Sequence, residues 1–252
     1  MKKITALTMI ALLGLPATGS AALPASTSIQ FVAGNNVWQP GQRYRNGADW
    51  LALTCTANAC QLSPATLTVQ TASWQGHYDE KPTAGQKLAF KPTTTLPGRV
   101  IAWLRMDAKQ KWLAPGPVTT YASNVAPLKQ PASEGTLEVA VDLPGGAQAR
   151  FVPLLSREKN AFFLQLRMPQ KRQMLGELAR CSHEVTTNYF LWAGDLDHDG
   201  KPDYLVSFVD ADGEIILYLS SIANPDELVG RAGLYNAPPH GGECDGGGWL
   251  GS

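Results

Sequence analysis

Apolar and polar residues alternate over short stretches along most of this chain, and clusters of Gly, Pro and Asn separate the stretches. Apolar runs of about four to eight residues between such turn signals are typical of β-strands. The pattern predicts a mainly β fold, with strands at 29–33, 50–54, 66–70, 136–141, 149–155, 162–167, 204–209 and 214–220.

Helical periodicity is confined to the second half of the chain. Lys171–Arg180 is the longest candidate, because apolar residues at 174, 175, 178 and 179 would share one helix face. A second helix is expected after Asn224, whose side chain would cap a short segment that opens with Pro225-Asp226-Glu227. We therefore expect one or two short helices within the β fold.

A Pro- and Ser-rich segment near the middle of the chain predicts the domain organisation. Residues 123–135 (SNVAPLKQPASEG) contain few apolar side chains, as expected of a linker. We place a boundary there and predict two β-rich domains, each sandwich-like or barrel-like. The first would cover residues 27–122 and the second residues 136–252.

The N-terminus resembles a secretory signal peptide. Lys2 and Lys3 precede an apolar run at 4–15, and small residues follow it, which predicts a signal over residues 1–22 with cleavage near Ala21 or Ala22. The run is too short to span a bilayer, and no later run is long enough to insert into a membrane. The pattern therefore predicts a soluble protein that is periplasmic or secreted.

The charge balance argues against two classes of partner. The chain has 21 basic and 21 acidic residues, and loss of Lys2 and Lys3 with the signal would leave 19 basic residues. Such a small net charge does not favour nucleic acid or an anionic membrane surface.

Four cysteines in an exported protein predict disulfide bonds. Cys55 and Cys60 enclose four residues and would close a hairpin loop, which leaves Cys181 and Cys244 as the second pair. A tetrahedral zinc site is the alternative for the second pair, because His183 and His240 lie close to these cysteines in sequence.

The densest group of chemically specific residues lies in LWAGDLDHDGKPDYLVSF, residues 191–208. Aspartates occupy positions one, three, five and nine of a loop, and Gly200 at position six allows a sharp bend. Because close carboxylates repel one another, a cation with a preference for oxygen would stabilise the loop, and Ca²⁺ fits a flexible ring of oxygens. The alternative is an Asp-rich turn without a bound ion. The predicted ligands are the side chains of Asp195, Asp197, Asp199 and Asp203 and the backbone carbonyl of Lys201.

This loop resembles the calcium-binding loop of FG-GAP and VCBS repeats, as found in integrin α-chains. An EF-hand would instead need a Glu at position twelve, where this chain has Val206 within a predicted strand. The resemblance covers about residues 191–208 and implies calcium ligation there. Because the chain contains one copy, and a propeller needs several blades, it does not imply a full propeller.

Catalytic motifs are sparse. There is no nucleophile elbow, phosphate-binding loop or metalloprotease motif. Asp79 and Glu80, close to Trp74 and Tyr78, are candidates for acid–base chemistry on a sugar, but adjacent carboxylates on an extended chain point to opposite faces. We therefore expect a non-enzymatic calcium-binding protein that binds another protein, for example an inhibitor or immunity protein. The alternatives are an envelope-polymer hydrolase and a structural envelope component.

Overall fold

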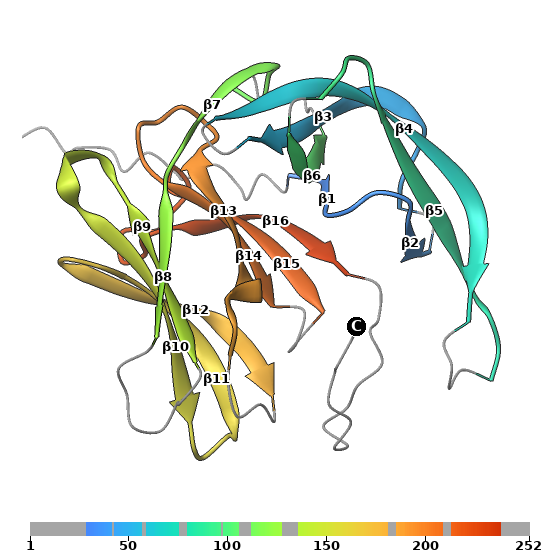
Figure 1. Cartoon of the computed structure of the whole chain (residues 1–252). Helices are drawn as coiled ribbons and strands as arrows, with labels where there is room; N and C mark the ends of the chain where they lie inside the picture. The colour runs from blue at the N-terminus through green and yellow to red at the C-terminus, as the bar shows by residue number, and fades with distance from the viewer. Residues whose placement is uncertain are drawn as a thin grey trace, which may run out of the picture.

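The computed structural model describes residues 29–41, 43–56, 59–75, 80–96, 98–105, 112–127, 136–180, 185–208 and 213–237. Over these residues the fold is mainly β, as predicted, with two antiparallel sheets that form neither a closed barrel nor a propeller (Figure 1). None of the helices among the described residues is long and apolar enough to cross a membrane.

The larger sheet has eleven strands, in the order β1-β6-β3-β4-β7-β13-β14-β15-β16, with β5 paired to β4 and β2 paired to β5. Its first seven strands are β1 (Phe31–Val32), β2 (Val37–Pro40), β3 (Gly47–Cys55), β4 (Cys60–Trp74), β5 (Thr83–Pro92), β6 (Arg99–Arg105) and β7 (Gly116–Thr120). The others are β13 (Phe190–Asp195), β14 (Asp203–Phe208), β15 (Glu214–Leu219) and β16 (Gly230–Asn236).

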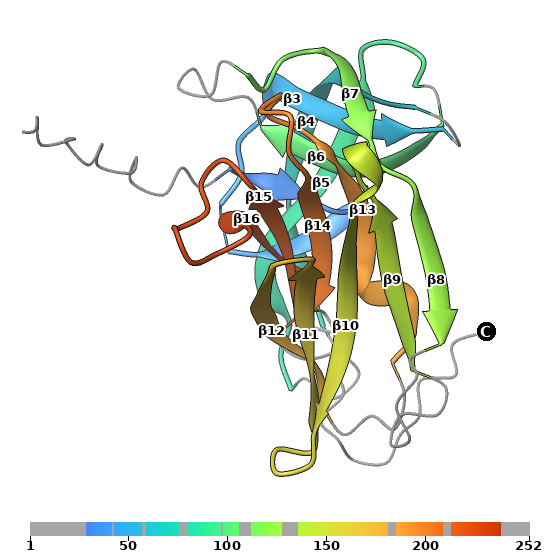
Figure 2. The same cartoon turned by 90° about the vertical axis from the view of Figure 1, so that its left-hand side faces the viewer.

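The smaller sheet has five strands in the order β12-β11-β10-β9-β8. They are β8 (Ser123–Pro127), β9 (Leu137–Asp142), β10 (Gln148–Ser156), β11 (Ala161–Met168) and β12 (Lys171–Arg180). The chain passes from the larger sheet to the smaller one at residues 121–122, between β7 and β8, as Figure 2 shows. Two short 3₁₀ helices, η1 (Pro144–Gly146) and η2 (Thr187–Tyr189), complete the described elements.

Strands β13, β14 and β15 lie between two hydrophobic cores. Trp192, Leu205 and Leu217 face a core shared with β1–β7, and the alternate residues Tyr204 and Ile216 face a core shared with the smaller sheet. Because both faces of these strands are covered, their sequences are nearly continuous apolar runs rather than alternating ones. The buried strand predicted at 204–209 is therefore confirmed as β14 over the described residues.

The expected linker differs from the structure in its first five residues. Residues 123–127 form β8, which pairs antiparallel with β9 from Ser123↔Val141 to Pro127↔Leu137. Local composition suggested a loop, but backbone pairing with β9 on one side makes this segment the edge strand of the smaller sheet. The remaining linker residues, 128–135, lie outside the described residues. The strands after residue 135 do not form one sheet: β9–β12 belong to the smaller sheet, and β13–β16 belong to the larger one.

The prediction of a helix at 171–180 was wrong, because this segment is strand β12. It pairs with β11, and the register shifts twice, so that Leu178 and Leu175 are the extra residues at two bulges. Both leucines reach the core between the sheets, whereas Met174 is 49% exposed. Two bulges three residues apart place apolar side chains at a spacing that mimics a helix face.

The second helix prediction was also wrong, because the segment after Asn224 is a turn. The side-chain and backbone N–H groups of Asn224 both donate to the carboxylate of Glu227, and the Glu227 N–H donates to the Asn224 carbonyl. These bonds satisfy the turn without further helical residues.

Candidate metal site

The acidic loop, residues 195–203, connects two strands of the larger sheet. Asp195 is the last residue of β13 and Asp203 is the first of β14. Between them the backbone enters the left-handed region at His198 (φ 60°) and at Gly200 (φ 81°). Glycine takes this conformation without steric cost, so the sharp bend that the sequence predicts at Gly200 is confirmed.

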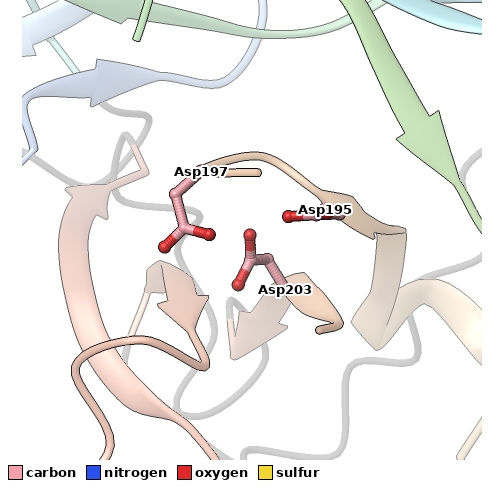
Figure 3. Close-up of side chains that lie close together, drawn as sticks. All are labelled: Asp195, Asp197 and Asp203. Atoms are coloured by element: carbon pink, nitrogen blue, oxygen red, sulfur yellow. The ribbon is translucent and has the colours of Figure 1, made fainter. Parts of the chain in front are cut away.

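Three aspartates of this loop converge. Carboxylate oxygens of Asp195, Asp197 and Asp203 all lie within 4.8 Å of one another, and Figure 3 shows the three groups turned toward one point. Asp203 is fully buried, Asp195 is 7% exposed and Asp197 is half-buried. Oxygen atoms in this arrangement are the donors that hard divalent cations prefer.

Backbone N–H groups hold the two buried carboxylates in place. Asp195 accepts hydrogen bonds from Asp199 N–H (3.0 Å) and Gly200 N–H (3.1 Å). Asp203 accepts from Leu196 N–H (2.7 Å) and from Ser220 N–H (2.9 Å). Because a carboxylate oxygen has two lone pairs, each of these oxygens keeps one acceptor position for a cation. The loop is therefore organised around its carboxylates before any ion binds.

The electrostatics of the cluster favour a bound cation. Burial, reinforced by the charge of Asp197, raises the pKa of Asp203 to about 8, although the N–H bonds from Ser220 and Leu196 oppose this shift. Burial also raises the pKa of Asp197. Among the described residues, no lysine, arginine or histidine forms an ion pair with any of the three converging aspartates. A divalent ion would supply the missing positive charge, so these residues fit the predicted Ca²⁺.

Two serines that sequence reasoning missed also reach this loop. The hydroxyl of Ser220 donates to the Asp199 carboxylate (3.0 Å to Oδ2), and the hydroxyl of Ser221 donates to Asp197. Both serines follow β15, whose antiparallel pairing with β14 brings its end beside the loop. They lie 17 or more residues from the aspartates that they contact, and no local spacing in the sequence could have indicated them.

The remaining predicted ligands are less directly placed. Asp199 is outside the converging group, and its carboxylate accepts from Ser220 and from the Lys201 N–H (2.8 Å). The Lys201 ammonium is exposed and lies 3.9 Å from Asp199 Oδ2. Ligation by Asp199 and by the Lys201 carbonyl stays a prediction.

The negative charges of the aspartates also act on Tyr121, which lies in the segment 121–122 where the chain passes between the two sheets. Burial raises the pKa of Tyr121, and the negative charges of Asp195, Asp203 and Asp199 raise it further. The Tyr121 N–H also donates to the carbonyl of Ala193 in β13. Tyr121 is therefore bonded to β13 and lies within the electrostatic field of the loop.

Other predicted residues separate into those that the structure describes and those that it does not. Cys55 and Cys60 form the predicted disulfide, at the β3–β4 hairpin. Glu80 is described and exposed. Five candidates, Asp79, Cys181, His183, His240 and Cys244, lie outside the described residues, as does the signal segment 1–22.

Comparison with known proteins found no match: no family model, no curated protein and no solved structure is similar to this chain. The resemblance of residues 191–208 to FG-GAP loops stays a prediction that rests on those residues alone.

Proposed function

We propose that this chain is an exported, non-enzymatic calcium-binding protein that binds another protein. One observation carries the proposal: three carboxylates, one of them fully buried, converge within 4.8 Å, and no cationic side chain in the described part of the chain is paired with them. Burying such a group without compensation costs several kcal/mol. A bound Ca²⁺ would offset this cost.

The candidate ligands and the serine that supports them lie at the ends of three consecutive strands. Asp195 ends β13, Asp203 begins β14, and Ser220 directly follows β15. When the loop carboxylates are fixed, the backbone bonds from Leu196 and Ser220 to Asp203 are fixed as well. We infer that calcium orders this end of the larger sheet and lowers the entropy cost of binding a partner there.

A cavity beside the loop supports a protein partner. It has a volume of about 210 Å³ and is lined mainly by apolar groups, which include Leu166, Met168, Pro202, Leu228 and Val229. Pockets for small-molecule ligands are usually larger, about 300–1,000 Å³. This cavity suits one apolar side chain presented by a protein, and Lys201 of the loop lies at its wall.

Export and the disulfide are consistent with this role. Cys55–Cys60 is a covalent closure that persists in an oxidising compartment. The N-terminal segment predicts delivery to such a compartment.

The proposal is tested by capture of a partner from a periplasmic extract of the source cells. We expect a partner at a one-to-one ratio that is retained in millimolar calcium and released by a chelator. Leu228→Asp, which places a charge at the cavity, should abolish capture. Leu234→Asp changes an exposed leucine on β16 and is the matched control. Capture that is indifferent to both calcium and Leu228→Asp would contradict the proposal.

A further inference from the structure

Two tryptophans lie on the solvent face of a three-stranded part of the larger sheet, β2-β5-β4. Trp38 of β2 and Trp74 of β4 have ring centroids 5.7 Å apart and ring planes inclined by 32°. Trp74 is 38% exposed and Trp38 is half-buried. Figure 1 shows β4 and β5 as a long ribbon that extends away from the smaller sheet. Large aromatic residues on such a face require an explanation.

The hydrophobic core does not explain these tryptophans, because it lies on the opposite face. Val37, next to Trp38, packs against the core, and so do Leu88 and Phe90 of β5. Gln39, on the other side of Trp38, is buried and donates to the hydroxyl of Tyr235. Side chains alternate between the faces of a strand, so Trp38 lies on the face away from this core, with its indole Nε1 shielded from solvent.

Gly85 of β5 leaves the space that the Trp38 ring of β2 occupies. A Cβ atom on Gly85 would lie 2.7 Å from two ring atoms of Trp38 and 2.2 Å from the Gln39 carbonyl oxygen. Only glycine permits this approach of the ring to β5. The close approach of the ring to Gly85 fixes the position of Trp38. Trp74, the more exposed member of the pair, is accessible to a ligand.

The three strands carry charge of one sign, and the hairpin loop between β4 and β5 adds exposed Glu80 and Lys81. Strands β2, β4 and β5 contain no aspartate or glutamate, and their charged residues are Lys87 and Lys91. Lys87 is exposed and is the strand partner of both Trp38 and Gln70. Gln70 and Thr68 are also exposed on β4. The strands thus place uncharged hydrogen-bonding groups and lysines beside the aromatic pair, and Lys81, Lys87 and Lys91 outnumber the one described carboxylate, Glu80.

We propose that the Trp38–Trp74 face binds a polysaccharide whose sugar rings carry carboxylate groups. The apolar face of a pyranose ring stacks on an exposed indole, amide and hydroxyl groups bond to sugar hydroxyls, and the lysines pair with the carboxylates. A protein partner would require a larger apolar centre around the rings. Nucleic acid also stacks on aromatic side chains, but the near-neutral chain lacks the basic surface that it requires.

This inference is independent of the proposed metal site, and its test keeps the two apart. The probe is a galacturonic acid hexamer, titrated calorimetrically into the full chain in a calcium-free buffer with chelator. We expect saturable binding that weakens as salt increases, because the lysine contribution is screened. Maltohexaose, which has the same length and no charge, should bind at least tenfold more weakly.

Two variants locate the binding. Trp74→Ala should weaken hexamer binding about tenfold, and Lys87→Ala about threefold with a reduced salt dependence. Lys87 is exposed, so Lys87→Ala should leave the unfolding temperature unchanged. Trp74→Ala loses the contact with Trp38 and should lower it by only about 1–6 °C. Met174→Ala, which changes an apolar residue on β12 that is 49% exposed, should have no effect.

Three results would overturn the inference: no saturable binding of the hexamer, equal binding by Trp74→Ala and the parent chain, or tighter binding of a single-stranded oligonucleotide at the same salt concentration. Lys87→Ala keeps the test decisive should Trp74→Ala fail to fold.

Discussion

Two hairpin connections in the larger sheet are closed by opposite means. The β3–β4 hairpin is closed by the covalent bond between Cys55 and Cys60, which are directly paired across the strands. The β13–β14 hairpin is closed by backbone N–H groups that donate to the carboxylates of Asp195 and Asp203. The first closure needs nothing from solution, whereas the second gathers negative charges that repel one another.

The two hairpins also meet in the core. The indole N–H of Trp192 in β13 contacts Cys60 Sγ at 3.4 Å, and both β4 and β13 pair with β7. We infer that the disulfide hairpin is a constant support for its neighbour, and that the acidic loop is the part of this region whose stability responds to ions. The following variants separate the two contributions.

Asp195→Ala should have the largest effect. For the parent chain, calcium at 100 times its dissociation constant should add about 2.7 kcal/mol to the free energy of unfolding, or about 5–11 °C in Tm for a chain of this size. The variant should lose this increment because it loses a converging carboxylate. Thermal unfolding with and without calcium measures both quantities. Asp226→Ala, at an exposed aspartate in the 225–226 turn, should keep the full increment.

Replacement of both Cys55 and Cys60 by serine should have an intermediate effect. Closing so short a loop contributes about 2 kcal/mol by the chain-entropy estimate. The loss should be the same with and without calcium, because the disulfide and the ion act on different hairpins. Denaturant unfolding in both conditions provides the comparison. If removal of calcium doubled this loss of stability, the disulfide and the ion would not act independently, and the prediction would be wrong.

Asp197→Asn should have the smallest effect, and its sign distinguishes repulsion from hydrogen bonding. An asparagine can still accept from the Asp199 N–H and donate to the Ser221 hydroxyl, so both contacts of Asp197 survive. Burial still raises the pKa of Asp203, but the charge that adds to this effect is removed. The ion-free protein should therefore become more stable by about 0.5–1 kcal/mol, while its calcium increment shrinks. Lower stability without calcium would contradict the repulsion argument.

The sequence predicted the parts of this fold that depend on neighbouring residues. Strand β14, the Gly200 bend and the Cys55–Cys60 closure depend on residues a few positions apart, and all three are confirmed. Of the four aspartates that the spacing predicted to share one centre, Asp195, Asp197 and Asp203 converge and Asp199 lies outside the group.

Features that depend on strand pairing could not be predicted in this way. The two bulges in the β11–β12 pairing gave Leu175 and Leu178 a helix-like spacing, and the pairing itself decided that the segment is a strand. Ser220 and Ser221 reach the acidic loop because β15 pairs with β14. Trp38 and Trp74 become neighbours only across β5, which separates their strands in the sheet.

Calcium binding to the chelator-treated protein is the most direct test of the account. A calorimetric titration should extend to about 10 mM, because extracellular calcium sites commonly have dissociation constants of about 10⁻⁴–10⁻³ M. We predict one bound ion per chain and no saturable binding to Asp195→Ala. An absence of saturable calcium binding by the folded parent chain over this range would contradict the central claim.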